Sequence, residues 1–250
     1  MKRALTTLAL GLLLCVGTAQ ADTISFVGPV GNYNTSTVTF VGLITAQGFY
    51  FTGGVWTTTD ANLFGRNQTN DHGLGLCNVQ ENASGACGTG SGGGDINELD
   101  NAGWAELIRL TLPAGYQWVS VQLSSLDNNG STDPNAWERG SLWADTDGLP
   151  GASGAIGNNL ICNFASSGSF TCVMAGGTGA EPIYSIPGQF ANSPYLFFEP
   201  RDWRPGGTNT NNDFLVMAVT ITQVPEPATL ALVGTGLSGL GLLSRKRRKA

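Results

Sequence analysis

The strongest constraint on the fold is a two-residue alternation of side chains in two segments. Phe214–Gln223 reads FLVMAVTITQ and Tyr116–Ser125 reads YQWVSVQLSS. Alternation with a period of two places successive side chains on opposite faces of a β-strand, and helices do not show it. Eight further segments have strand-like composition: Thr23–Val27, Thr37–Thr45, Phe49–Trp56, Glu106–Leu112, Ser141–Ala144, Leu160–Phe164, Phe170–Met174 and Tyr195–Glu199. We therefore expect an all-β protein.

Turn-forming sequences separate these segments, among them DNNGSTDPN, DTDGLPG and RPGGTNTNND. The chain contains 36 glycines, but Trp, Phe, Val and Ile recur throughout, and a disordered chain lacks such a supply of core residues. About ten short strands without a repeat predict one antiparallel β-sandwich of jelly-roll type, spanning residues 22–223.

The N-terminus has the three parts of a secretory signal peptide. Met1–Arg3 is cationic, Ala4–Val16 is apolar, and Ala19-Gln20-Ala21 is a small-x-small cleavage signal. A permanent N-terminal anchor is the alternative, but the apolar run is too short to span a membrane. We expect a leader over residues 1–21, with cleavage after Ala21.

Charge is distributed unevenly along the chain. The formal net charge is −6, yet seven of the twelve Lys and Arg residues lie in the leader or in residues 245–249. Residues 22–224 keep five arginines against seventeen carboxylates, so their net charge is 5 − 17 = −12, and they contain no lysine. This balance argues against nucleic acid as a partner and is compatible with divalent cations and hydrated polymers.

Five cysteines become four once Cys15 leaves with the leader. Cys77 and Cys87 are separated by nine residues, and so are Cys162 and Cys172. In an exported protein this spacing predicts two local disulfides. Zinc is the alternative, but the chain has no C-x-x-C sequence and only one histidine, His72.

The C-terminus joins three features in a fixed order. Pro225-Glu226-Pro227 precedes the charge-free residues 228–244, and five cations follow. The two prolines disfavour helix and keep the segment before the apolar run extended. The apolar run has the minimum length for a membrane span, and the basic end would stay in the cytoplasm while the body lies outside.

This ending, from Val224-Pro225-Glu226-Pro227 to residue 250, resembles the PEP-CTERM sorting signal of Gram-negative bacteria. The resemblance implies transient anchoring in the inner membrane and recognition by an exosortase. It further implies removal of the tail and delivery to the cell surface or the exopolysaccharide matrix. A permanent C-terminal anchor is the alternative.

Acidic clusters suggest a structural calcium ion. Asp95, Glu98 and Asp100 form one group and Asp145 and Asp147 another, and short carboxylates in glycine-rich turns are ligands that calcium uses. Asp and Asn also occupy ordinary turns for backbone reasons. Trp104 and Trp143 lie near these clusters and could stack on sugar rings, or else be buried in the core.

No catalytic motif stands out. There is no G-x-S-x-G sequence, and any Ser-His-Asp chemistry would need His72. A pair of glycosidase carboxylates cannot be picked out among seventeen. We therefore expect a non-enzymatic binding or structural module associated with extracellular polysaccharide. The alternative is a secreted carbohydrate-active enzyme on the same β-sandwich.

Overall fold

The computed structural model describes most of the body of the chain. The described residues are 20–28, 30–68, 71–79, 98–101, 105–126, 137–151, 156–166, 168–169, 171–202 and 212–224. The chain divides into two units, one of residues 1–20 and 223–250 and one of residues 21–222. The description below concerns the second unit, because only Gln20, Gln223 and Val224 of the first are described.

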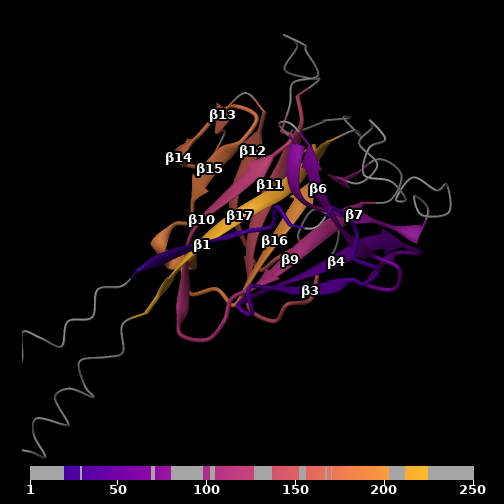
Figure 1. Ribbon diagram of the computed structural model, residues 1–250, viewed down its shortest axis with the longest axis horizontal. Coiled ribbons are helices and arrows are strands. Elements are labelled where there is room, and N and C mark those ends of the chain that lie inside the picture. The colour runs from indigo at the N-terminus through magenta and orange to yellow at the C-terminus, as the bar shows by residue number, and fades with distance from the viewer. Residues whose placement is uncertain are drawn as a thin grey trace, which may run out of the picture. The chain divides into compact units, whose positions relative to one another are not determined.

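Two antiparallel sheets make up this unit (Figure 1). The strands of sheet A, in spatial order, are β14 (Met174–Gly177), β15 (Pro182–Ser185), β10 (Tyr116–Ser124), β17 (Asp213–Gln223), β7 (Asp71–Cys77), β6 (Asn62–Gln68) and β2 (Gly31–Asn32). In addition, β1 (Ala21–Ser25) and β8 (Leu99–Asp100) both pair with β17.

Sheet B is built in the same way. Its spatial order is β13 (Gly168–Ser169), β12 (Asn159–Ala165), β11 (Arg139–Asp145), β16 (Tyr195–Pro200), β9 (Glu106–Thr111), β4 (Ile44–Thr52) and β3 (Thr37–Phe40), and β5 (Val55–Thr57) pairs with β4. A short 3-10 helix, η4 (Gly188–Phe190), precedes β16. The two sheets pack face to face, which confirms the predicted β-sandwich.

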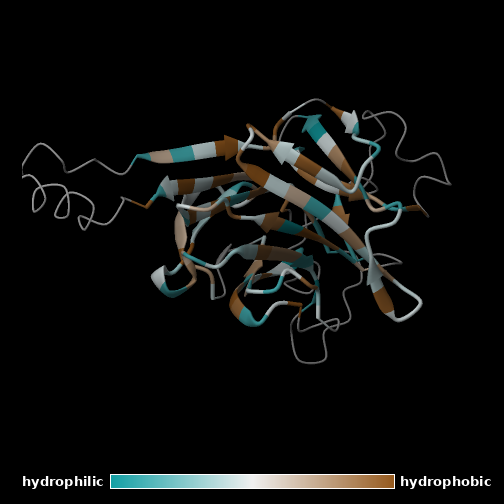
Figure 2. Ribbon diagram, turned by 90° about the horizontal axis from the view of Figure 1, so that it is seen from below, coloured by the Kyte–Doolittle hydropathy of each residue, from teal (hydrophilic) through white to brown (hydrophobic). Residues whose placement is uncertain are grey.

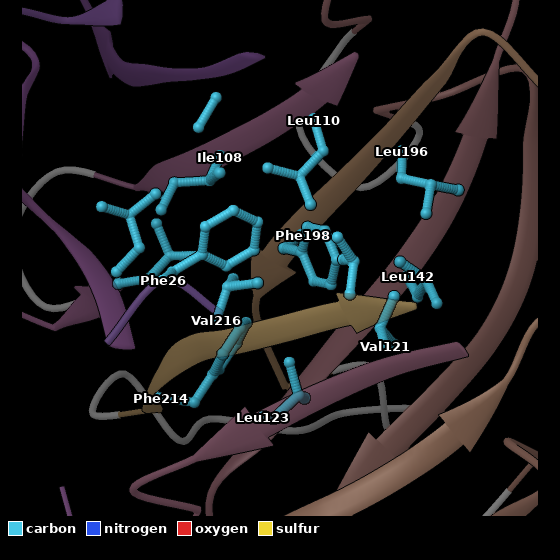
Figure 3. Packing of buried hydrophobic residues seen from close by; sticks show 14 of the residues in the cluster. Phe26, Ile108, Leu110, Val121, Leu123, Leu142, Leu196, Phe198, Phe214 and Val216 are labelled. Carbon is cyan, nitrogen blue, oxygen red and sulfur yellow. The ribbon is translucent and has the colours of Figure 1, made fainter. Parts of the chain in front are cut away.

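The core lies between the sheets. Successive residues of a strand point to opposite faces of its sheet, and along several ribbons brown positions alternate with paler or teal ones (Figure 2). Ile108 and Leu110 of sheet B face Val216 and Phe214 of sheet A, and all four are fully buried (Figure 3). Burying side chains of this size stabilises the fold by about 1.5–3 kcal/mol each. Gly48 of β4 approaches the Leu76 side chain of β7 closely, which shows how tightly the sheets pack there.

The two strands with the clearest alternation form as predicted. Along β17, Phe214, Leu215 and Val216 are all fully buried, as expected of a strand covered on both faces. β10 follows the pattern less closely. Val121 and Leu123 are buried, but Val119 is 38% exposed and Trp118 is buried instead. The chain after η4 covers Trp118, whose Nε1 donates to the Ser193 carbonyl at 2.7 Å.

Two predicted strands are hairpins. Thr37–Thr45 turns at Val41 and Gly42, whose φ angles are 52° and 68°, and Phe49–Trp56 turns at Gly53 and Gly54, at 59° and 86°. Positive φ at consecutive turn residues suits the right-handed twist of paired strands. The predicted strand Phe170–Met174 is also wrong in part, because residues 171–173 separate β13 from β14.

The hairpin of β6 and β7 was not predicted from the sequence, because its glycines hide the alternation. Gly73 has φ 141°, and a Cβ there would lie 2.7 Å from the Val216 carbonyl oxygen and 2.9 Å from the Met217 Cα. The glycine therefore permits close approach of β7 to β17.

Candidate functional site

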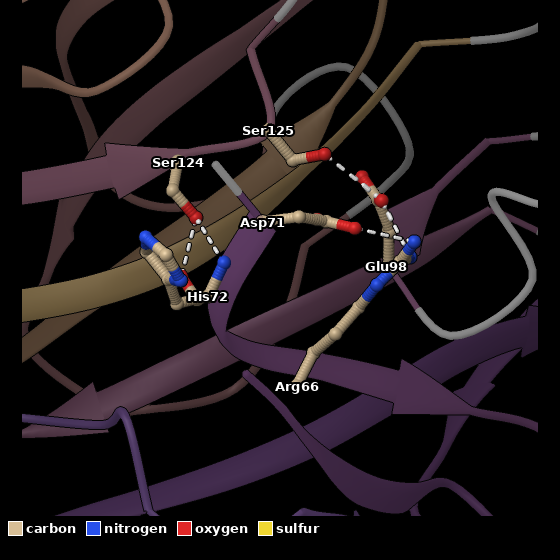
Figure 4. Close-up of polar contacts among 6 residues, drawn as sticks. All are labelled: Arg66, Asp71, His72, Glu98, Ser124 and Ser125. Atoms are coloured by element: carbon tan, nitrogen blue, oxygen red, sulfur yellow. Dashed lines mark hydrogen bonds and ion pairs between the residues drawn. The ribbon is translucent and has the colours of Figure 1, made fainter. Parts of the chain in front are cut away.

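A buried polar cluster lies where several strands begin or end. We define it by Arg66, Asp71, Glu98 and Ser125 (Figure 4). Arg66 bridges two carboxylates: its Nη1 donates to Glu98 Oε1 at 2.6 Å, and its Nη2 pairs with Asp71. Ser125 donates to the same Glu98 oxygen at 2.9 Å. Ser125 makes this hydrogen bond from a backbone conformation with φ 59°, which is uncommon for a residue other than glycine.

Glu98 is the chemically unusual member of the cluster. It is 2% exposed. Burial raises the pKa of its carboxyl group well above the usual range, and the charges of Asp213 and Asp71 raise this pKa further. Arg66 and Ser125 oppose the rise without cancelling it. Glu98 therefore holds its proton at a higher pH than an ordinary glutamate.

Further buried polar residues surround the cluster. Glu106, which is fully buried at the start of β9, accepts from the Asn78 side chain at 2.8 Å and from the Asp100 amide at 3.2 Å. Asn212 donates its amide to the Asn101 side chain at 2.8 Å. These contacts hold the ends of β7 and β8 against the starts of β9 and β17, and they place Asp100 in the same polar region as Glu98.

The formal charge of the body overstates the charge of its surface. Of the thirteen carboxylates that the structure describes, seven are buried: Glu98, Asp100, Glu106, Glu138, Asp145, Glu199 and Asp213. Arg66 and Arg139 are buried as well. Thr, Ser, Asn, Gln and Gly residues therefore make up much of the described surface, and the fixed charges on it are sparse.

Asp145 and Asp147 lie apart from this region, in the loop after β11. Asp145 accepts from the backbone amides of Asp147, Gly148 and Asn158, at 3.1, 2.6 and 3.1 Å. Asp147 accepts from the Leu149 amide at 2.9 Å. The structure thus assigns both carboxylates to holding a turn, and it does not bring them to Glu98 and Asp100.

Trp143 is buried on the outer face of sheet B. It packs with Phe49, Leu107, Ile156 and Phe197 in a second apolar cluster, and its Nε1 donates to Glu199 at 3.3 Å. The loop after β11 covers this face, because Arg109 donates to the Gly148 carbonyl and Trp56 donates to the Gly151 carbonyl at 2.8 Å. Trp143, being 8% exposed, is a core residue in this structure and has no free face for a sugar ring. Trp104 lies outside the described residues.

His72 is not part of a nucleophilic arrangement in the described structure. Its Nε2 contacts Glu181 Oε1 at 3.1 Å. The Ser124 hydroxyl contacts the His72 backbone rather than its ring. A serine nucleophile would need the opposite arrangement, with its hydroxyl bonded to the imidazole.

No group of three or more His, Cys, Asp or Glu residues in the described part of the chain is placed to hold a metal ion. Asp95, the remaining predicted calcium ligand, lies outside that part. Calcium binding near Glu98 and Asp100 therefore stays a prediction.

The structure contains the predicted disulfide between Cys162 and Cys172. Both cysteines are 3% exposed and belong to the main core. Cys77 is also disulfide-bonded. Its predicted partner, Cys87, lies outside the described residues.

The chain leaves the sandwich at β17. That strand ends at Gln223, Val224 is exposed, and Pro225-Glu226-Pro227 follows outside the described residues. A protein-family model matches residues 223–248. These residues are a PEP-CTERM protein-sorting motif. The PEP-CTERM motif implies an exported protein that an exosortase sorts to the cell surface.

The family match does not extend to the body of the chain. No curated protein and no solved structure matches the chain. Among the described residues, no helix is long and apolar enough to cross a membrane. The predicted leader, apart from Gln20 and Ala21, and the predicted apolar run at 228–244 lie outside the described residues.

Proposed function

We propose that the protein is a non-enzymatic module of the cell surface or extracellular matrix that associates with exopolysaccharide. The sorting motif at 223–248 carries this proposal. The secretion machinery exports the precursor, a signal peptidase removes residues 1–21, and the C-terminal span anchors the body in the inner membrane until an exosortase removes the tail.

The surface of the sandwich supports a neutral, hydrated partner. In the part of the body that the structure describes, seven carboxylates are buried and few charges are exposed, so this surface offers hydroxyl and amide groups rather than an ionic patch. Such groups hydrogen-bond sugars without the salt dependence that nucleic-acid binding shows.

Processing can be tested in the native host. Replacing Pro225-Glu226-Pro227 with alanines should leave export intact and retain the precursor in the inner membrane, because the exosortase loses its recognition segment. Intact-mass analysis of surface-delivered wild-type protein should show that residues 245–250 are missing. Surface protein that still carries residues 245–250 would refute tail removal and favour a permanent anchor.

Binding and catalysis separate in one further experiment. Purified residues 22–223 are incubated with exopolysaccharide from the host, and retention in affinity electrophoresis is compared with the appearance of new reducing ends. Retention without new reducing ends supports the binding module. Release of oligosaccharides would favour the alternative, a secreted carbohydrate-active enzyme.

We also propose that the sandwich is a jelly roll. The strand order supports this topology, because the last two strands are both inserted between earlier ones: β16 lies between β11 and β9, and β17 lies between β10 and β7. Along β7, β9, β10, β11, β12, β15, β16 and β17 the chain visits the sheets in the order A, B, A, B, B, A, B, A. Two interlocked Greek keys have this order. A crystal structure with β16 or β17 at a sheet edge would refute the assignment.

A further inference from the structure

The strand that follows the predicted leader is paired over its full length. β1 runs antiparallel to β17, with Ala21 opposite Thr222, Asp22 opposite Ile221 and so on to Ser25 opposite Ala218. Ala21 is the last residue of the predicted leader. The bond that the signal peptidase is expected to cut, Ala21–Asp22, therefore lies inside a strand of the folded sheet.

From this placement we infer that leader removal and docking of β1 onto β17 compete for the same backbone, so that leader removal comes first. Each backbone N–H and C=O has one strong partner at a time, and a sheet ladder occupies those groups. A protease that binds its substrate as an extended chain needs the same groups. Hydrolysis of the bond consumes one water, and leaves the Ala21 carboxylate on the leader and the Asp22 amine on the body. The inference rests on the proposed cleavage after Ala21.

Contacts farther along the chain hold β1 in place. Ile24 is 3% exposed and Phe26 is fully buried. The Phe26 amide donates to the Met217 carbonyl at 2.8 Å, and its ring meets that of Phe40 edge-on at 4.8 Å between centroids. The Thr23 and Thr220 hydroxyls lie 3.0 Å apart. The strand is thus anchored beyond the bond to be cut.

Chain order gives the signal peptidase time to act before pairing. β17 is the last strand of the body, so about 200 residues separate Ala21 from Thr222. At 5–20 residues per second, β17 is synthesised roughly 10–40 s after β1. During that interval β1 has no partner strand. Once docked, β1 covers the edge of β17 up to Thr222, immediately before the sorting motif begins at Gln223.

The test uses full-length precursor, folded in detergent with its leader intact, and purified signal peptidase. In the Thr23→Cys/Thr220→Cys variant, a disulfide locks β1 to β17, since the native hydroxyls already touch. We expect the folded precursor, locked or reduced, to be cut at least about tenfold more slowly than urea-unfolded precursor, and the locked form to be cut most slowly, because reduction allows β1 to detach for part of the time. Thr23→Cys alone and reductant-treated wild type are the matched controls. Phe26→Ala, which removes an anchor away from the bond, should be cut faster than wild type.

Two results would overturn the inference, and they have different meanings. Cleavage of the locked, folded precursor as fast as the unfolded precursor would show that pairing does not protect the bond. Cleavage of unfolded precursor at a bond other than Ala21–Asp22, read by N-terminal sequencing, would instead remove the leader assignment. Neither result touches the sorting of the C-terminus, which the Pro225-Glu226-Pro227 replacement tests separately.

Discussion

The Cys162–Cys172 disulfide ties the two sheets together at one side of the sandwich. Cys162 lies in β12 of sheet B, and Cys172 lies in the connection between β13 and β14, where the chain passes to sheet A. Its loop is short, with a sequence separation of 10. In the chain-entropy model, closing a loop of about ten residues in the unfolded chain stabilises the folded state by about 2.7 kcal/mol.

We expect the double substitution Cys162→Ala/Cys172→Ala to lower the stability of residues 22–223 by this amount. For a domain of about 200 residues each kcal/mol corresponds to roughly 2–4 °C, so the fall in Tm should be roughly 5–11 °C. Calorimetry measures the Tm, and urea titration measures both the free energy of unfolding and its dependence on urea, the m-value.

The m-value identifies the cause of the loss. Without the crosslink the unfolded chain expands and exposes more surface, so m should rise. Loss of packing by the two buried sulfurs would lower the free energy of unfolding but leave m unchanged. An unchanged m-value together with an unchanged Tm would refute the claim that this bond constrains the unfolded chain.

Three further predictions concern the interior of the sandwich. Glu98→Gln should flatten the dependence of stability on pH. Because the pKa of Glu98 is raised in the folded state, wild type loses stability as pH rises from the unfolded-state pKa through the folded-state pKa, whereas the Gln side chain does not titrate. Urea titrations from pH 4 to pH 9 that gave parallel curves for the two proteins would contradict this. Gly73→Ala should destabilise by about 1–3 kcal/mol in the same assay, because the new Cβ meets backbone atoms of β17 at positive φ, and a neutral result would mean that β7 shifts freely. Calcium should raise the Tm of wild type, and this rise should be lost in Asp100→Ala but kept in Asp145→Ala. A Tm that does not change with calcium would refute the predicted calcium site.

Much of the fold could be predicted because its central strands alternate clearly. β17 and β10 begin and end within a residue of the predicted limits. The β6–β7 hairpin could not be found, since Gly65, Gly73 and Gly75 interrupt its pattern. The close approach of Gly73 to Val216 explains that glycine, but only the folded structure reveals it.

The candidate site was predictable only in part. Glu98 and Asp100 are close in sequence, and with Asp95 they were predicted to bind calcium, which stays a prediction. Arg66 and Asp71 join them from the β6–β7 hairpin and Ser125 from the end of β10, and no sequence spacing connects these segments. The acidic pair Asp145 and Asp147 matched the calcium pattern equally well. In the structure, however, the Asp145 carboxylate accepts hydrogen bonds from the backbone amides of Gly148 and Asn158.

Burial changes what the charge of the body means for its partners. A sum of −12 over residues 22–224 suggests a surface that repels every polyanion, but a buried carboxylate contributes little field outside the protein once it is paired or protonated. Arg66 pairs with Glu98 and Asp71, and burial raises the pKa of the Glu98 carboxyl group. The exposed carboxylates of the described residues, Asp22, Asp60 and Asp147, lie in β1, a turn and a loop rather than in one patch. We therefore expect nucleic acid to bind poorly mainly because residues 22–224 contain no lysine, and we expect an uncharged polysaccharide to meet no electrostatic barrier on the described surface.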